Sequence, residues 1–218
     1  MDTGIDVLEA MATTRAIRRY RDLPVPEPDL ATILWHAARA PSGSNRQAFR
    51  FIVLRDEPAT ASARALLGQA FRESWDRKRV VSGFDTGSGT VSGSPKARAA
   101  ATMQHFVDHF EEIPVVVLAC LQRYRAATPT EGGSVYPACQ NLLLAARALG
   151  YGGALTMWHR PVEAELRAIL GIPDVVALLA CITLGVPAGR HGPLRRRPLG
   201  EIVHDGRWRR RATWIHDG

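Results

Sequence analysis

Two long apolar runs restrict the fold of this 218-residue chain more than any other feature of its sequence. Residues 115–121 and 175–184 are rich in Val, Leu, Ile and Ala, and their β-branched residues favour buried β-strands. Residues 49–54 predict an earlier strand, and residues 154–158 predict a short one between the two long runs. Since helical patterns separate these strands along the chain, we expect an α+β fold.

The segments between the strands repeat their apolar residues at helical spacing. One helix is expected to begin at Asp29, a residue type suited to the N-cap position. The others are expected over residues 5–15, 59–80, 96–110, 134–149 and 161–170. No internal repeat and no domain boundary are apparent, so we expect a single domain over residues 1–218.

Residues 82–95 are rich in Gly and Ser and contain almost no residues that build a core. Long segments of this kind in compact domains are often lids or binding loops, so we expect a flexible insertion or a lid here. A disordered insertion without a role has the same composition and stays open as the alternative.

The cysteines and the hydropathy pattern indicate the cellular compartment of the protein. Cys120, Cys139 and Cys181 each lie in an apolar run, with no spacing typical of a zinc site or a redox pair. We expect buried, reduced thiols and a cytoplasmic protein. No apolar run reaches the roughly 18–20 residues of a membrane-spanning helix, so no membrane partner is expected.

The positive charge of the chain comes almost entirely from arginine. The formal net charge is +7, and Lys78 and Lys96 are the only two lysines among 28 basic residues. Arginine is well suited to bind phosphate, although codon bias explains a high Arg content equally well. One cluster includes Arg15 and Arg18, which we place on one helix face; the second spans residues 190–197.

Two functional interpretations of the arginine clusters follow. A phosphate-bearing cofactor held from both ends of the chain is one, and a nucleic acid is the other. The chain has no helix-turn-helix pattern and no stacking aromatics among its basic residues, so no nucleic-acid partner is expected. Phosphate loops, dinucleotide-binding glycine motifs, the nucleophile elbow and the zinc-protease helix are absent. We interpret His105 and His109 as a solvated or interface helix face and expect no metal.

Several segments, taken in order, resemble the nitroreductase family of flavoproteins. These are RAIRRY at 15–20, PVP at 24–26, PSGSNRQ at 41–47, FIV at 51–53, PACQNLLLAARALG at 137–150, GVP at 185–187 and RRRPLGEIVH at 195–204. No single segment is specific, but the ordered set covers about residues 15–208. The resemblance implies a nitroreductase-like α+β fold, with a small, mostly antiparallel sheet surrounded by helices.

The resemblance also implies an activity and an assembly. Family members are intertwined homodimers with an FMN at each of two interface sites. They take a hydride from NADH or NADPH and reduce nitroaromatics, quinones or related acceptors in a ping-pong mechanism. The flavin carries this chemistry, so no catalytic side chain is expected. Residues 188–218 resemble an extended C-terminal arm that packs on the partner subunit.

Site residues follow from the matching positions. The resemblance implies that Arg15 and Arg18 bind the FMN phosphate, with Ala16 and Ile17 between them. Arg196, or alternatively Arg195, is implied to reach the same phosphate. The loop residues implied to lie near the partner's flavin are Ser42, Gly43, Asn45 and Gln47. Those implied to present backbone N–H groups to the flavin ring are Leu155, Thr156 and Met157.

The sequence departs from the family pattern in the phosphate segment. Many members have Arg at the position of Thr14 and Ser at that of Ala16, so Arg19 is a candidate replacement contact. The preference for NADH or NADPH and the acceptor stay open, as do reductive dehalogenation and flavin fragmentation. A protein of the same fold that binds flavin without turnover is the alternative function.

Overall fold

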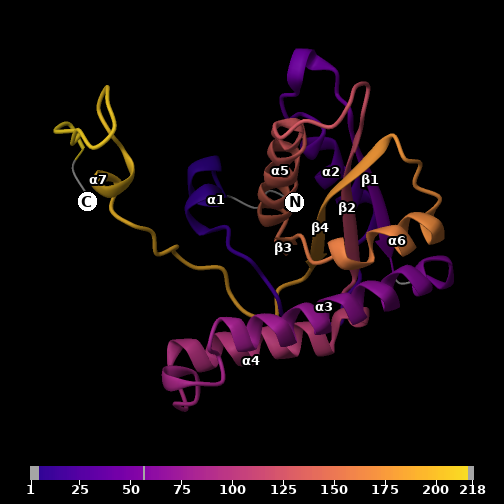
Figure 1. Cartoon of the computed structure of the whole chain (residues 1–218), viewed down its shortest axis with the longest axis horizontal. Helices are drawn as coiled ribbons and strands as arrows, with labels where there is room; N and C mark the ends of the chain where they lie inside the picture. Colours follow the sequence, from indigo (N-terminus) through magenta and orange to yellow (C-terminus); the bar gives the residue numbers. More distant parts are fainter. Residues whose placement is uncertain (1–4, 56, 216–218) are drawn as a thin grey trace.

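Four antiparallel strands form the centre of the molecule, in the spatial order β1-β2-β4-β3 (Figure 1). The computed structural model describes residues 5–55 and 57–215. The strands are β1 (Phe49–Arg55), β2 (Val115–Gln122), β3 (Gly152–Thr156) and β4 (Val176–Gly185). All four predicted strands are therefore confirmed, and the sheet places β1 and β3 at its two edges.

Helices cover both faces of this sheet. On one face lie α2 (Glu27–Ala37) and α5 (Tyr136–Ala148), packed against alternate residues of β2 such as Val117. On the other face lie α3 (Ala61–Val81), α4 (Pro95–Asp108) and α6 (Glu163–Leu170), packed against residues such as Leu118. Because both faces are covered, every residue of β2 except Gln122 is buried, which explains why its sequence is apolar without alternation.

The remaining helices are short. Among the described residues, α1 (Val7–Thr13) is the first helix and α7 (Leu199–Ile202) is the last. Six single turns of 3₁₀-helix connect the larger elements: η1 (Gly43–Asn45), η2 (Pro58–Thr60), η3 (Gly87–Gly89), η4 (Phe110–Glu112), η5 (Glu131–Ser134) and η6 (Arg160–Val162). None of the helices described is both long and apolar enough to cross a membrane.

The start of α2 differs from the expectation. Its N-cap is Pro26 and not Asp29, which lies in the first turn and accepts a hydrogen bond of 2.5 Å from the Tyr151 hydroxyl. The two prolines at this end have φ values suited to a helix start and need no N–H partner there. The Asp29 carboxylate still lies at the positive end of the helix dipole, which stabilises it.

The segment after α1 also differs from the expectation. The helix ends at Thr13, and the backbone is extended at Thr14 and continues without helix to the bridge between Tyr20 and Pro187. It pairs with the sheet end instead, because the Ile17 N–H donates to the Gly153 carbonyl at 2.9 Å. The inference that Arg15 and Arg18 share a helix face is therefore wrong, since residues three apart in an extended chain point to opposite sides.

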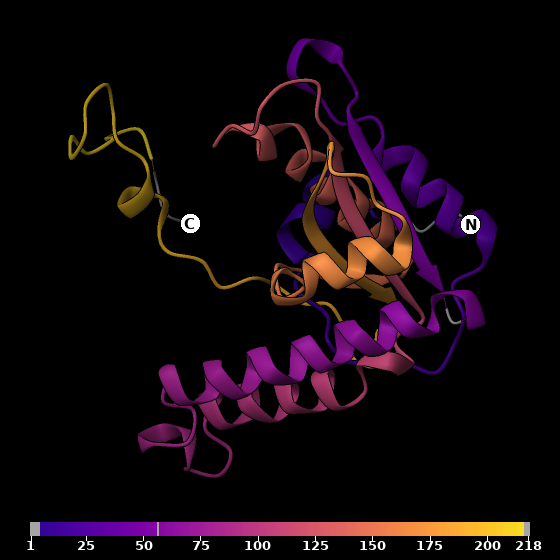
Figure 2. The ribbon, with the colours of Figure 1, turned by 45° about the vertical axis from the view of Figure 1, so that its right-hand side comes forward.

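Two segments extend away from the sheet. The hairpin of α3 and α4 runs beyond it, and residues 82–94 close the far end of this hairpin (Figure 2). After β4 the chain leaves the body, and α7 lies apart from it in both views (Figures 1 and 2). Four large apolar side chains of this arm are exposed: Leu199, Ile202, Trp208 and Trp214.

The three cysteines are free and buried, as expected. Burial raises the pKa of the Cys120 thiol to about 11 and that of Cys139 to about 12. Cys181 is shifted in the same direction by its complete burial. At neutral pH these thiols are protonated, and they act as small core residues and not as nucleophiles.

Candidate functional site

A cavity of about 300 Å³ lies beside the end of β3; we refer to it as the β3 cavity. Arg18 from the extended segment forms one side of it, and Lys78 of α3 and Met103 of α4 form another. The backbone and side chains of residues 154–158 complete the lining. Segments from four parts of the chain therefore meet here, including two of the regions expected to bind a flavin.

Arg18 is the charged group of this cavity. Its side chain is half-buried, and within the described residues it has no hydrogen-bond or ion-pair partner. Burial lowers the pKa of this guanidinium from its ordinary value, but arginine stays protonated at neutral pH. A partly desolvated cation with five unused donors requires an acceptor, so the cavity favours a ligand with anionic or carbonyl oxygens.

The open edge of β3 supplies backbone donors to the same cavity. The Gly153 carbonyl accepts from Ile17 on the side of the strand that faces away from β4. Backbone groups alternate along an antiparallel strand, so the N–H of Leu155 faces this open edge and the N–H of Thr156 faces β4. The Thr156 side chain accepts from the Trp158 N–H at 3.2 Å and closes the strand end.

Arg15 lies in a second basic cluster, at the end of α1. Its charge, together with that of Arg147, lowers the pKa of His191, although burial is the larger cause. Arg147 donates to the Thr13 hydroxyl at 3.3 Å. His191 lies at 3.2 Å from the Tyr151 carbonyl oxygen. The cluster therefore joins residues from α1, α5 and the segment after β4.

Gly152 allows these segments to approach so closely. A Cβ at this position would lie 2.5 Å from Cγ1 of Ile17 and 3.1 Å from Nε2 of His191. A larger residue would push the extended segment away from β3, and Arg18 would move with it. Glycine is required at this position because the neighbouring side chains leave no space for a Cβ. It is not required for the conformation of a turn.

The predicted meeting of the two chain ends is seen in part. The Leu194 N–H donates to the Ala12 carbonyl at 3.3 Å, so Arg195 and Arg196 begin beside the last turn of α1. Both arginines are exposed, and the one hydrogen bond described for the Arg196 side chain goes to the Arg195 carbonyl. The structure shows no contact between them and Arg15.

The loop before β1 holds the remaining predicted residues. The Ser42 hydroxyl accepts from the Gln47 N–H at 2.9 Å, and the Gln47 amide donates to the Asn45 side chain at 3.1 Å. Gly43 N–H donates to the Ser134 hydroxyl at 3.1 Å. The loop is thus held in one shape by its own side chains and by η5.

This loop and the β3 cavity lie at opposite edges of the sheet. The loop precedes β1, and three strand spacings of about 4.8 Å separate β1 from β3. Figure 1 shows the loop at the top, beyond the start of β1, whereas the extended segment joins the sheet at its lower end. One copy of the chain does not bring both groups of predicted residues to one small ligand.

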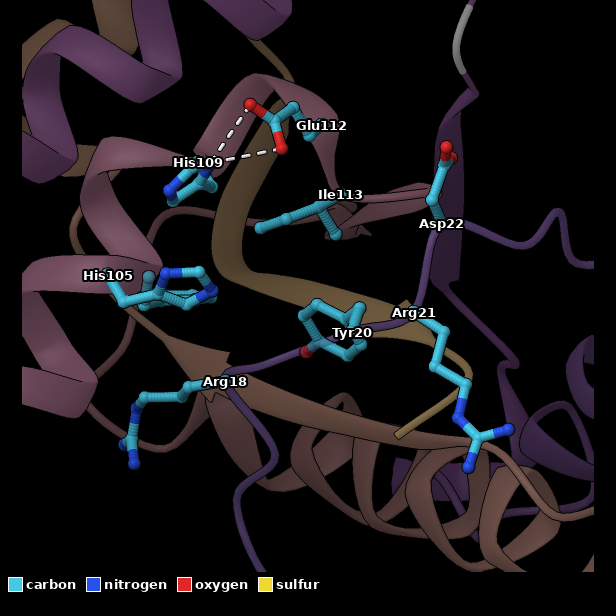
Figure 3. A pocket seen from close by; sticks show the side chains of 9 residues that line it. Arg18, Tyr20, Arg21, Asp22, His105, His109, Glu112 and Ile113 are labelled. Atoms are coloured by element: carbon cyan, nitrogen blue, oxygen red, sulfur yellow. Dashed lines mark hydrogen bonds and ion pairs between the residues drawn. The ribbon is translucent and has the colours of Figure 1, made fainter. Parts of the chain in front are cut away.

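A further pocket lies on the other side of Arg18 (Figure 3). The helical residues His105, His109 and Glu112 face Tyr20 across it, and the guanidinium groups of Arg18 and Arg21 point away from each other. His109 Nδ1 lies 3.0 Å from both Glu112 carboxylate oxygens.

The histidine pair in this pocket lies on α4 and at its C-cap. The two imidazole rings are 4.3 Å apart, centroid to centroid. Burial and the neighbouring His109 lower the pKa of His105, so this ring is neutral at pH 7. Both rings line the pocket; His109 is exposed, in agreement with the solvated helix face expected from the sequence, and His105 is partly buried. Among the residues the structure describes, no group of three metal-binding side chains is present.

The sequence did not single out His191, Lys78 or Trp158, which lie in or beside these cavities. Lys78 is one of only two lysines, which is a weak signal. His191 lies in a Gly- and Pro-rich segment, and nothing in its spacing points to α1. Only the fold shows that these side chains approach Arg15 and Arg18.

Comparisons with known proteins agree with this architecture. The sequence model of the nitroreductase family matches residues 11–186. An NADH dehydrogenase of Thermus thermophilus is 33% identical over 222 residues, covering 93% of this chain and 98% of that protein.

Comparison with solved structures also shows this fold. A protein from Desulfovibrio desulfuricans, solved in complex with FMN, is 26% identical with a TM-score of 0.68, covering 94% of this chain and 98% of its own. An FMN- and NADPH-dependent nitroreductase from Sphigopyxis sp. strain HMH, at 22% identity, shares the fold with a TM-score of 0.70, covering 91% and 98%.

Proposed function

Since the chain belongs to the nitroreductase family, we propose that it is an FMN-dependent oxidoreductase that uses NADH or NADPH as electron donor. Nitroaromatics, quinones or related acceptors are its proposed oxidants, in a ping-pong reaction. The observation that carries this proposal is Arg18, a half-buried cation without a described partner, beside the open backbone edge of Leu155. Together they form an electropositive cavity next to a strand end.

The residues of the β3 cavity fit the ring of FMN. The flavin ring has carbonyl oxygens and ring nitrogens at one end, which need donors such as the Arg18 guanidinium and the Leu155 N–H. Its other end is apolar, and Met103 and Phe106 line the cavity on the helix side. We therefore place Arg18 at the ring and not at the phosphate.

The basic cluster at the end of α1 fits the phosphate. Arg15 and Arg147 supply positive charge there, and Arg195 and Arg196 begin close by. Guanidinium groups bind phosphate through paired hydrogen bonds, so a movement of the exposed Arg196 side chain would complete the site. Because Thr14 and Ala16 lack the family's usual contacts, Arg19 and these groups are the proposed replacements.

We propose that the complete site needs two copies of the chain. The loop 42–47 lies too far from the β3 cavity of its own subunit, so it would face the flavin of the partner. The exposed apolar side chains of the arm, such as Trp208 and Trp214, would be buried on the same partner. Residues 82–95 stay a proposed lid within a single domain.

When bound, FMN supplies the hydride transfer. The chain's own residues bind and orient it. Arg18 and the Leu155 N–H place positive charge beside the ring, which favours negative charge there. No protein nucleophile is required.

An absorbance spectrum of the purified protein tests this function. We expect flavin bands, which are bleached when NADH or NADPH is added without oxygen and restored by a nitroaromatic or a quinone. A flavin that neither donor bleaches would support storage without turnover. A protein that stays colourless after incubation with FMN would contradict both functions.

A further inference from the structure

A third cavity, of about 180 Å³, lies at the opposite end of the sheet; we call it the Tyr124 pocket. It is formed where the loop before β1 meets the loop after β2. Ser42, Gly43 and Arg46 come from the first loop, and residues 123–126 and 128–134 supply most of the rest. No flavin-binding role was expected for Arg46 or for any residue of the loop that follows β2, from Arg123 to Ser134.

The charges of this pocket do not cancel. Arg123 forms a two-point ion pair with Glu131, with N–O distances of 2.6 and 2.9 Å, and these two charges neutralise each other. The Arg46 guanidinium lies 4.0 Å from the centroid of the Tyr124 ring, and that of Arg125 lies 5.4 Å from it. Neither has a carboxylate partner among the described residues, so two positive charges flank one exposed aromatic ring.

This arrangement fits one class of ligand. Since Arg46 covers one face of the Tyr124 ring, a planar aromatic ring can pack against the exposed remainder of Tyr124. A carboxylate on that ring can accept hydrogen bonds from Arg46 and Arg125. An engineered protein cavity of about 150 Å³ accommodates benzene, so the volume suits a single ring. The hydroxyl groups of Thr128, Thr130 and Ser134 line the wall and add further donors.

We propose that the Tyr124 pocket selects electron acceptors that carry a carboxylate on an aromatic ring. The inference rests on the proposed function, because Ser42 and Gly43 line this pocket and belong to the loop assigned to the partner's flavin. An acceptor held here lies beside that loop. For a nitroarene, two electrons and two protons, supplied by NAD(P)H and one further proton, convert the nitro group to a nitroso group and release water.

Binding of two isosteric probes tests the proposal. The FMN-loaded protein is titrated by calorimetry with 4-nitrobenzoate and with its neutral analogue 4-nitrobenzamide. We expect the benzoate to bind about tenfold more tightly, as one charge-assisted hydrogen bond implies. Arg125→Gln and Arg46→Gln should each remove most of this difference, whereas Tyr124→Leu should weaken both probes.

Arg39→Gln is the matched control, because this guanidinium stacks on the exposed Trp35 ring at 4.4 Å but lies outside the pocket. It should leave both affinities unchanged. In steady-state reduction the Arg125→Gln variant should raise KM for the benzoate by about tenfold and leave KM for the benzamide within about twofold.

Equal binding of the two probes to the unaltered protein would overturn the proposal, as would an equal loss of both in Arg125→Gln. Failure of the proposed function is a separate result, since it shows as a flavin that NAD(P)H does not bleach. Calorimetric selectivity for the benzoate in such a protein would still support an aromatic carboxylate site and would contradict only its role in electron transfer.

Discussion

The two ends of the sheet use their polar side chains in opposite ways. Beside β3, Arg15 and Arg18 make no hydrogen bond or ion pair within the described part of the chain. In the loop before β1, the side chains of Ser42, Asn45 and Gln47 are hydrogen-bonded within the loop. Beside β3 the arginine donors stay unpaired, whereas the loop before β1 uses these three side chains to hold its shape. In that loop, the Arg46 guanidinium, which stacks on Tyr124, is the charged group proposed to bind a ligand.

The loop also holds an unusual backbone. Ser44, Asn45 and Gln47 have φ values of 52°, 51° and 48°, in the left-handed region that residues other than Gly and Asn seldom adopt. Strain of this kind persists where surrounding contacts impose it and is common at binding sites. We therefore propose that this loop is rigid and meets a flavin whose charged groups are bound by a second copy of the chain.

Removal of the arm should have the largest effect. A chain that ends at Pro198 keeps Arg195, Arg196 and the contact of Leu194 with Ala12 but lacks Trp208 and Trp214. If the arm covers a partner, this chain should sediment as a monomer and retain no FMN, with a circular dichroism spectrum close to that of the full chain. A truncated chain that stays dimeric and yellow would contradict this role.

Removal of the unpaired positive charge of Arg18 should have the next largest effect. Arg18→Gln keeps a shorter polar side chain but removes the charge from the β3 cavity. FMN affinity should fall about 10- to 100-fold, as expected for a charge-assisted hydrogen bond in a partly buried site. Fluorescence titration of the apoprotein with FMN measures it, and Arg77→Gln, on the exposed side of α3, is the control.

A mixing experiment tests directly whether one site uses both ends of two chains. Arg18→Gln and Asn45→Ala chains should each be defective alone. After unfolding and refolding at equal amounts, half the dimers are mixed, and each mixed dimer has one intact site. About a quarter of the normal activity should therefore return. No recovery in dimers shown to be mixed would place both residues in the site of a single chain.

Relief of backbone strain in the loop should have a smaller effect. Ser44 has a positive φ, and no hydrogen bond of its side chain is described. Ser44→Gly should therefore stabilise the folded protein by up to about 1 kcal/mol in thermal or urea unfolding. Ser44→Ala keeps the Cβ and should give no gain; an equal gain in both variants would show that strain is not the cause.

The smallest effect concerns pH at the Tyr124 pocket. The hydrogen bonds from Arg123 lower the pKa of Glu131 from its ordinary value. A lowered folded-state pKa stabilises the protein above the unfolded-state pKa, and this contribution is lost as pH falls through the folded-state value. Glu131→Gln should cost at most about 1 kcal/mol at pH 7, and the difference in Tm should shrink in acid. A Tm difference between the two proteins that grows below about pH 4 would contradict the expected direction of this pH dependence.

Much of the fold was predictable because it depends on local patterns. The runs that became β2 and β4 are apolar on both faces, and only a strand buried between two helical layers requires that composition. The helices were predictable from their spacing. The position of α2's N-cap was not, because the four residues at positions 26–29 are two prolines and two acidic residues, and each of these residue types is compatible with a helix start.

The candidate site was predictable only as separate pieces. The segment around Arg15 and the strand at Leu155 were recognised by their resemblance to a family. Their contact depends on the missing side chain of Gly152, on the hydrogen bond from Ile17 to Gly153 and on the chain reversal after β4. Such long-range contacts leave no periodic signal, so His191 and Lys78 were not found.

The sequence by itself determined the composition of the core, the class of the fold and the family, since hydrophobic burial and strand and helix periodicity are local properties of the chain. The tertiary structure decided which charges stay unpaired. Arg18 and Arg123 are the same residue type, yet Arg123 faces Glu131, whereas Arg18 lies in a cavity that offers no described carboxylate. The reason is physical: the partner of a charge is set by distance in space, which folding alone determines.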